Sequence, residues 1–285
     1  MHASRTSKTR KWASSTLRNF STAPKFSSVD PEELKKFSNL SGLWWDEGGE
    51  FKPLHSMNAL RIPFIRNGLV NSRVVSTKKA NTPSSLEGLN ILDVGCGGGI
   101  LAEPLARIGA NVVGLDASEE AVQVAEQHAK LDTTLSDRLK YRHGTLEELA
   151  EEGQVYDAVV MSEVLEHMNN PKHCLQLASN LVKPGGSIFL TTLNRSCVSW
   201  LGGIIAAEYL LRLVPPGTHD WNKFLSPLEV ENMLSDSDCT TRSIHGMSYN
   251  ILTNSWHWSS NVSINYALHA LKLSEQRVEE PKQTE

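Results

Sequence analysis

The sequence predicts an α/β protein with a doubly wound, mostly parallel seven-stranded sheet and an N-terminal helical extension. From Leu89 onward, short apolar strands alternate with helices, which is typical of a parallel sheet covered by helices on both faces. The glycine-rich turn Gly95–Gly99 joins the first of these strands to the first helix. Asp116 ends the second strand about twenty residues later, as in nucleotide-binding folds.

The helical extension is expected over residues 30–75. Asp30 and Pro31 are typical of a helix N-terminus, and Glu33 places an acid at the third helical position. A second helix is expected over residues 57–67. Residues 76–88 are rich in Lys, Ser, Thr, Asn and Pro, and are expected to form a loop before the sheet.

The alternating region is expected to form one domain over residues 86–270. Its expected strands cover residues 89–94, 111–115, 139–142, 157–161 and 187–192, and its expected helices cover 101–108, 117–129 and 171–182. An insertion is expected at 196–225. A short helix near 227–234 and strands near 243–247 and 262–267 follow. Residues 271–285 are polar and are expected to be disordered.

Residues 1–29 differ from the rest of the chain. They contain six Lys or Arg residues and many Ser and Thr, and no acid precedes Asp30. This composition predicts a mitochondrial transit peptide, and a basic arm that binds nucleic acid or acidic partners is the alternative. Taking those six bases from the 28 Lys and Arg leaves 22 against 32 acids, a net charge of −10. Such an acidic body matches DNA or RNA poorly, so we expect a small-molecule substrate and no nucleic acid.

The strongest local motif is Asp-Val-Gly-Cys-Gly-Gly-Gly at residues 93–99. Glycines let the backbone turn sharply and bring its amides against a ligand without Cβ collisions, and Asp116 can accept hydrogen bonds from ribose hydroxyls. The fingerprint of NAD enzymes needs a further glycine where this chain has Ile100. The spacing instead resembles the first motif of class I methyltransferases, which cradles the methionine part of S-adenosylmethionine. A connector without a ligand is the alternative.

In class I methyltransferases, two further loops complete the cofactor pocket. The matching positions here are Gly144-Thr145-Leu146, after the third strand, and Met161-Ser162, at the end of the fourth. Leu146 suits the adenine face, although ordinary core packing would also account for an apolar residue there.

Six short motifs make the resemblance specific. In chain order they are Trp44-Trp45-Asp46, Phe51-Lys52-Pro53-Leu54-His55, Asn58-Ala59-Leu60-Arg61, Ser162-Glu163-Val164-Leu165-Glu166-His167, Thr192-Leu193-Asn194-Arg195 and Gly217-Thr218-His219-Asp220. From about residue 30 to 270, the chain resembles the ubiquinone-biosynthesis O-methyltransferase family. Ala59 departs from the proline expected there, and a helix accommodates alanine easily.

The resemblance implies two methylations of a polyprenylated ring, one on a dihydroxybenzoate intermediate and one on a demethylubiquinol. It implies a cofactor site for S-adenosylmethionine formed by Arg61, Gly95, Gly97, Asp116 and Ser162. It also implies catalytic roles for His167 and Glu163, and a magnesium ion (Mg²⁺) bound by Glu163, Glu166 and His167. A peripheral position on the matrix side of the mitochondrial inner membrane, within a complex of coenzyme Q biosynthesis proteins, is expected as well.

The residue types fit this chemistry independently. Methyl transfer is an in-line displacement, and orientation alone can contribute about 7–11 kcal/mol. A free phenol has a pKa of about 10, so the enzyme must make it nucleophilic, and a divalent ion can stabilise the phenolate. On a helical turn, Glu163, Glu166 and His167 at i, i+3 and i+4 would share one face, and two carboxylates suit magnesium.

Two alternatives for this trio stay open. His167 could act as a general base without a metal, because Glu-His pairs also follow the fourth strand in methyltransferases that use none. The three side chains could also form a solvated, hydrogen-bonded turn. An imidazole is an uncommon magnesium ligand, which keeps these alternatives in view.

The segment 198–214 is apolar on most faces and about 17 residues long, which is marginal for spanning a bilayer. Glu208 and Arg212 are spaced i, i+4 on one face. The segment is therefore expected to form a lid or a helix in the membrane interface, with an ordinary buried helix as the alternative.

Three other functions compete. The first is a methyltransferase with another aromatic acceptor, C-methylation included, and it would leave the Trp-Trp-Asp and Gly-Thr-His-Asp motifs unexplained. An NAD(P)-dependent oxidoreductase conflicts with Ile100. A catalytically dead scaffold conflicts with the intact Gly95, Gly97 and Asp116.

Overall fold

The computed structural model describes residues 27–196 and 223–274. The predicted transit peptide up to residue 26, the apolar segment 198–214 and the tail beyond residue 274 lie outside these residues. Ser28 and Val29, which the sequence interpretation assigns to the leader, pack on the body. Val29 forms a β-bridge with Met168, and the Ser28 amide donates to Glu147 at 2.7 Å.

The described residues form the following elements. The helices are α1 Pro31–Asn39, α2 Lys52–Asn71, α3 Thr77–Ala80, α4 Ala102–Arg107, α5 Glu119–Ala129, α6 Leu146–Glu151, α7 Pro171–Asn180 and α9 Pro227–Ser235, with short 3-10 turns η1 Ser41–Leu43, η2 Thr133–Leu135 and η3 Leu165–His167. The strands are β1 Asn90–Val94, β2 Asn111–Asp116, β3 Leu139–His143, β4 Tyr156–Ser162, β5 Val182–Leu193, β6 Cys239–Asn250, β7 Ser255–Ser259 and β8 Asn265–Lys272.

The strands form one sheet in the order β3-β2-β1-β4-β5-β8-β6-β7. The β3, β2, β1, β4 and β5 strands run parallel, and β8 pairs antiparallel with both β5 and β6. The predicted doubly wound, mostly parallel α/β class is confirmed. The order reverses between β1 and β4, and ligands of such sheets bind at this switch point, beyond the carboxyl ends of the strands.

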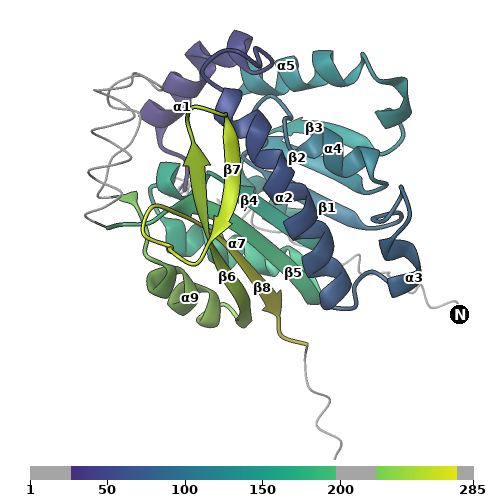
Figure 1. Ribbon diagram of the computed structural model, residues 1–285, viewed down its shortest axis with the longest axis vertical. Helices are drawn as coiled ribbons and strands as arrows, with labels where there is room; N and C mark the ends of the chain where they lie inside the picture. Colours follow the sequence, from purple (N-terminus) through teal and green to yellow (C-terminus); the bar gives the residue numbers. More distant parts are fainter. Residues whose placement is uncertain (1–26, 197–222, 275–285) are drawn as a thin grey trace, which may run out of the picture.

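The predicted number of seven strands is wrong, because β7 adds an eighth strand antiparallel to β6. Its sequence, Ser-Trp-His-Trp-Ser, is short and flanked by Asn and Ser, so the sequence interpretation passed over it. Tertiary contacts stabilise this strand: Trp256 Nε1 donates to Pro53 O at 2.9 Å, and Asn254 accepts from Ser56 at 3.1 Å. The β6–β7 hairpin therefore lies against α2, as Figure 1 shows.

Alternation along the strands divides the core between the two faces of the sheet. Ile91 of β1 packs with α2 and α4, whereas its neighbour Leu92 packs with α6, α7 and α9. In Figure 1, α2 crosses the face of the sheet toward the viewer and α7 lies behind it. Both residues are fully buried, which is what apolar side chains on a two-sided parallel sheet require.

The N-terminal extension covers the carboxyl edge of the sheet. Asp30 caps α1 by accepting from the Glu32 amide, and Pro31 occupies the first turn, as predicted. After η1, Trp44 packs against the glycine turn that follows β1. The longer helix α2 begins at Lys52, five residues before its expected start, and runs to Asn71. Together α1, α2 and the segment between them form a cap over the switch point.

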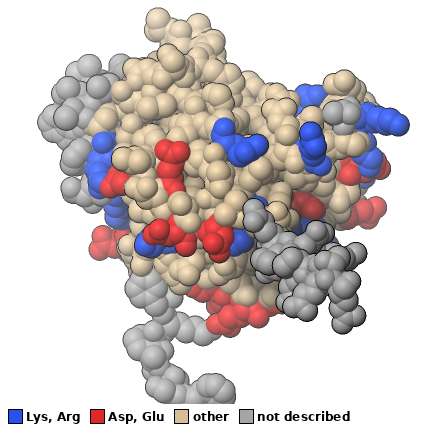
Figure 2. Space-filling model, turned by 90° about the horizontal axis from the view of Figure 1, so that it is seen from below, with Lys and Arg blue, Asp and Glu red and all other residues tan. Residues whose placement is uncertain are grey.

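The described surface carries no strong single-sign charge in the view of Figure 2, where acidic and basic side chains are mixed and the upper part is free of both. Within residues 27–196 and 223–274, no helix is both long enough and apolar enough to cross a bilayer.

Candidate active site

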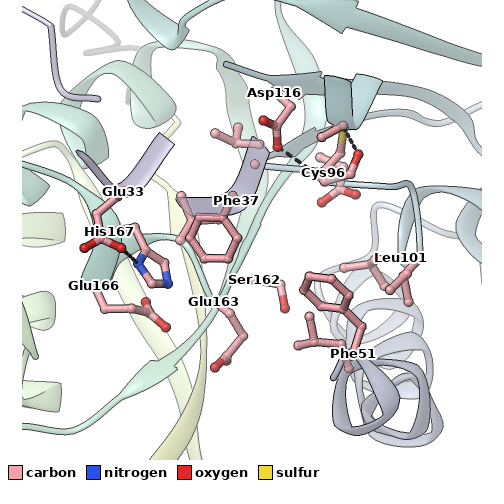
Figure 3. Close-up of a pocket in the computed structure, with 18 of the residues that line it drawn as sticks. Glu33, Phe37, Phe51, Cys96, Leu101, Asp116, Ser162, Glu163, Glu166 and His167 are labelled. Atoms are coloured by element: carbon pink, nitrogen blue, oxygen red, sulfur yellow. Dashed lines mark hydrogen bonds and ion pairs between the residues drawn. The ribbon is translucent and has the colours of Figure 1, made fainter. Parts of the chain in front are cut away.

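A cavity of about 500 Å³ lies at the switch point, between the carboxyl ends of β1, β2 and β4 and the N-terminal cap. Figure 3 shows Asp116 and Cys96 on one side of it, and Glu33, Glu166 and His167 on another. All the predicted site residues, Arg61, Gly95, Gly97, Asp116, Ser162, Glu163, Glu166 and His167, line this single cavity. The structure therefore brings the predicted residues together, and their roles stay predictions.

The glycine turn after β1 needs its glycines. Gly95, Gly97 and Gly99 have φ values of 66°, 52° and 88°, a left-handed region that side chains disfavour. A Cβ on Gly97 would lie 2.4 Å from the Trp44 ring. The turn is thus pressed closely against the indole, and its backbone faces the cavity without side chains in the way.

Asp116 ends β2 beside this turn. Its carboxylate accepts hydrogen bonds from the amides of Gly97 and Ser118, both at 2.8 Å. Burial raises the pKa of Asp116, and the bonds from Ser118 and Gly97 oppose that rise. A carboxylate has about four lone-pair positions, so two backbone donors leave room for the hydroxyls of a ligand.

Arg61 connects the cap to the sheet. It lies on α2 and is buried, and its Nη1 donates to Ser162 Oγ at 2.8 Å, at the end of β4. Its Nε donates to Asn58 and its Nη2 to Asn58 and the Leu54 carbonyl. Burial lowers its pKa to about 10, against the opposing influence of Glu163 and Asp93. The guanidinium stays cationic at neutral pH and is the main positive charge between two buried acids.

Three carboxylates in the cavity keep a buried oxygen without a hydrogen-bond partner among the described residues: Glu50 Oε2, Asp93 Oδ2 and Glu163 Oε1; the last two lie beside Arg61. Burial raises the pKa of Asp93 to about 7, with Arg61 opposing and Asp116 adding to the rise. Burial also raises the pKa of Glu163 to about 7, and the nearby Glu166 contributes. Both acids would be stabilised in the charged form by a cationic ligand.

The predicted helical turn that joins Glu163 to His167 is wrong. Only residues 165–167 are helical, and Glu163 stands before them with a φ of 56°, its amide donating to Thr191 O at 2.8 Å. The strand β4 ends at Ser162, and Glu163 takes a left-handed conformation directly after it. The i, i+3, i+4 argument therefore does not apply to Glu163.

The three side chains of this loop have different environments. Glu166 is 3% exposed and accepts from Thr192 Oγ1 at 2.7 Å, so the trio is not a solvated turn. His167 Nδ1 lies 3.0 Å from Glu33 Oε2. Among residues 27–196 and 223–274, no group of three or more His, Cys, Asp and Glu side chains is already arranged to hold a metal ion.

Glu33 is the site residue that sequence reasoning missed. It was interpreted as a helix-start acid, yet it is buried in α1 and faces the cavity, 134 positions from His167. Burial raises its pKa, but hydrogen bonds from His167 and Lys36 outweigh this and hold it at about 2. The Phe37 ring meets the imidazole edge-on at 4.8 Å. Only the three-dimensional contact distinguishes Glu33 from the exposed Glu32.

The far side of the cavity is apolar. The β6–β7 hairpin contributes Met247, Tyr249, Ile251 and Trp256, which we call the hairpin wall. Leu146 lines the cavity and also belongs to the core cluster with α6, α7 and α9, and its predicted place at the adenine face stays a prediction. The cavity is thus lined by polar groups at the ends of β1, β2 and β4 and by apolar side chains from the cap and the hairpin.

Comparison with known proteins gives a consistent result. A methyltransferase domain family matches residues 69–244. The mitochondrial ubiquinone biosynthesis O-methyltransferase of Rattus norvegicus is 45% identical over 259 residues, covering 90% of this chain and 74% of that protein. The ubiquinone biosynthesis O-methyltransferase of Aliivibrio fischeri strain MJ11 is 45% identical over 243 residues, covering 85% of this chain and 97% of that protein. The mitochondrial protein of Dictyostelium discoideum is 40% identical over 250 residues, covering 85% and 77%.

Solved structures share the fold at lower identity. Magnesium protoporphyrin IX methyltransferase from Synechocystis PCC 6803, with bound S-adenosylhomocysteine, is 23% identical with a TM-score of 0.50, covering 73% of this chain and 85% of that one. A S-adenosylmethionine-dependent methyltransferase from Methanosarcina mazei is 19% identical with a TM-score of 0.52, covering 66% and 94%.

Proposed function

This chain belongs to the family of ubiquinone biosynthesis O-methyltransferases, and we propose that it methylates a ring hydroxyl of polyprenyl dihydroxybenzoate and of demethylubiquinol. The methyl donor is S-adenosylmethionine. The observation that carries the substrate assignment is one cavity lined by both acidic groups and apolar hairpin side chains, since a polar ring with a long apolar tail needs both.

The glycine turn and its neighbours form the proposed cofactor site. Asp116 accepts the ribose hydroxyls with the lone pairs that Gly97 and Ser118 leave available. Gly95 and Gly97 let the cofactor approach the backbone closely, and Ser162 holds Arg61 in the cavity by a 2.8 Å hydrogen bond. Arg61 keeps a positive charge beside the negative groups of the pocket.

We propose that the ring hydroxyl is activated at the loop after β4. Glu163 and Glu166 are hard oxygen donors, and the unpartnered Oε1 of Glu163 has a chemistry that fits a magnesium ion, although the three side chains are not arranged in advance. When bound, such an ion would stabilise the phenolate. His167 completes the set, with Glu33 fixing its ring through Nδ1, the arrangement common for metal-binding imidazoles.

The same contact would also orient His167 as a general base that takes the hydroxyl proton. This second role is favoured by the short Glu33–His167 contact itself, because a carboxylate at Nδ1 fixes the orientation of the ring. The response to chelation separates the two roles.

The hairpin wall is the proposed site of the polyprenyl tail. Ile251 both lines the cavity and is 43% exposed, and the adjacent Leu252 is 96% exposed at the hairpin tip. From Ser243 to Leu271 the sequence has no Asp, Glu, Lys or Arg. An uncharged, apolar edge at the mouth of the cavity supports peripheral contact with a bilayer. The apolar segment 198–214 would add to it.

The proposed location is mitochondrial, at the matrix side of the inner membrane and within a complex of coenzyme Q biosynthesis proteins. The mitochondrial relatives and the acid-free, basic residues 1–26 support the first part, and family resemblance alone supports the complex. Residues 1–26 fused to a reporter should direct it to mitochondria, and a reporter that stays cytosolic would refute the leader.

Product analysis tests the activity. The full chain is incubated with S-adenosylmethionine, a short-tailed prenyl dihydroxybenzoate and magnesium, and the methylated position is determined by NMR. O-methylation is expected. Methyl transfer to a ring carbon would overturn the acceptor assignment, and binding of NAD in place of S-adenosylmethionine in a calorimetric titration would overturn the cofactor.

A further inference from the structure

Two buried polar atoms on the segment that covers the glycine turn have no hydrogen-bond partner among residues 27–196 and 223–274. One is a donor, Nε1 of Trp44, and the other is an acceptor, Oε2 of Glu50. Both residues line the cavity. Buried polar groups are nearly always paired in folded proteins, so such atoms in a binding cavity call for a partner from the ligand.

Packing fixes Trp44 without using its N–H group. The indole stacks on Phe51 with ring centroids 4.0 Å apart and planes within 11°. It also fills the space where Gly97 and Gly98 would carry a Cβ, and its carbonyl is bonded to His55 at 2.8 Å. The neighbouring Trp45 attaches the segment to the turn by donating to Gly98 O at 2.9 Å. The Trp44 N–H is therefore held in place against the glycine turn, with its own bond unmade.

We propose that Trp44 and Glu50 bind the amino-acid end of S-adenosylmethionine. The Trp44 N–H donates to the cofactor's carboxylate, and Glu50 accepts from its ammonium group. The inference rests on the proposed function. Asp116 is assigned to the ribose and Leu146 to the adenine, which leaves this end of the cofactor. It is also the part that carries an anionic acceptor beside a cationic donor, the complement of the two unpartnered atoms.

The nearby charges agree with this division. Arg61 is the obvious cation for a carboxylate, but its Nε, Nη1 and Nη2 all donate to protein oxygens already. A second donor from the cap would complete the recognition. The acids Asp93 and Glu163 already interact with Arg61, so Glu50 is a further acceptor in the cavity for the ammonium group.

Two conservative variants test the roles. Trp44→Phe keeps an aromatic ring for stacking on Phe51 and removes the N–H, and Glu50→Gln keeps the shape and removes the charge. Glu47→Gln, exposed on the same segment, is the matched control. Affinities are measured by calorimetry on the full chain with three probes: S-adenosylmethionine, its decarboxylated analogue, and the analogue in which hydrogen replaces the amino group. Thermal melting checks that each variant is folded.

Each variant should weaken S-adenosylmethionine binding by about ten- to a hundredfold, the scale of a hydrogen bond to a charged group, and the control should not. Trp44→Phe should bind the decarboxylated analogue as well as the unmodified protein does, and Glu50→Gln should do so for the des-amino analogue. Equal losses with all three probes, or unchanged affinity of folded variants for S-adenosylmethionine, would overturn the assignment. Failure of the unmodified protein to bind the cofactor at all would instead overturn the proposed function.

Discussion

At the end of β2, Asp116 accepts two hydrogen bonds from backbone amides at 2.8 Å, whereas at the end of β4 Glu163 keeps a buried oxygen without a partner among the described residues. The two carboxylates lie in one cavity and at the same edge of one sheet. The first is oriented before any ligand arrives. The second keeps one oxygen unbonded, and burial and the nearby Glu166 raise its pKa to about 7 against the opposing charge of Arg61.

The difference indicates separate roles for Asp116 and Glu163. A group oriented by the backbone gives selectivity for a cofactor that must always bind in one way. A carboxylate whose partner is missing gains most when a cation or an acidic proton reaches it, so the loop after β4 should respond strongly to metal and substrate. The comparison predicts that binding at the glycine turn and reaction at the loop can be damaged separately.

The largest expected effect is that of a chelator. Removing divalent ions should abolish turnover while S-adenosylmethionine binding persists, and added magnesium should restore the rate, because the metal site is proposed at the loop after β4 and not at the glycine turn. Glu163→Gln should behave like chelated enzyme and recover partly in excess magnesium. Rates and calorimetric affinities are measured on the same samples.

Full activity after exhaustive chelation would eliminate the metal and leave His167 as a base. In that case His167→Ala alone should be severely impaired, and its rate should recover at high pH, where the phenol ionises without help.

The next effect concerns the other end of the cavity. Asp116→Ala should weaken S-adenosylmethionine binding by about 1.5–3 kcal/mol, the scale of a hydrogen bond to a charged group. The magnesium requirement of the residual activity should stay the same. Calorimetry measures the affinity, and an unchanged value in a folded variant would contradict the assignment of Asp116 to the ribose.

Glu33→Gln should cost about 10–100-fold in magnesium affinity or rate, as expected for a partner that orients a functional imidazole. The exposed Glu32→Gln on the same helix is the control and should be neutral. Steady-state kinetics with a magnesium titration measure both variants. If Glu33 and Glu32 variants behave alike, the contact between α1 and His167 has no part in the reaction.

The smallest expected effect is on the pH dependence of cofactor binding. Burial raises the pKa of Asp93 to about 7, so this acid is half protonated at neutral pH in the free protein. The cofactor carries a positive sulfonium, which favours the charged carboxylate, so binding should release protons and tighten as pH rises from about 6 to 8. Calorimetry in buffers of different ionisation enthalpy measures the release, and Asp93→Asn should reduce it, with Glu163 supplying the remainder. Proton uptake on cofactor binding would contradict the assignment of Asp93 as a group that loses its proton.

The sequence predicted the half of the site that depends on local spacing. The glycines at 95–99 and Asp116 lie close together along the chain, and backbone conformation alone demands the glycines. The alternation of strands and helices predicted the parallel part of the sheet for the same reason.

Contacts across long separations explain what the sequence did not predict. Glu33 looks like a helix-start acid, and its contact with His167 depends on how α1 lies over the sheet. The strand β7 exists because Trp256 and Asn254 attach to α2. Glu163 adopts a left-handed conformation because of the turn that follows β4, which no periodicity indicates.

The 134-residue separation of Glu33 and His167 also has a consequence for the order in which the molecule folds. The glycine turn and Asp116 belong to adjacent strands separated by a single short helix, so their loop closes early. Closing the longer loop costs more chain entropy, and the α1 contact gains nothing until the sheet edge exists. During refolding from denaturant, amides of the glycine turn should become protected from hydrogen exchange before the contact between α1 and His167 forms.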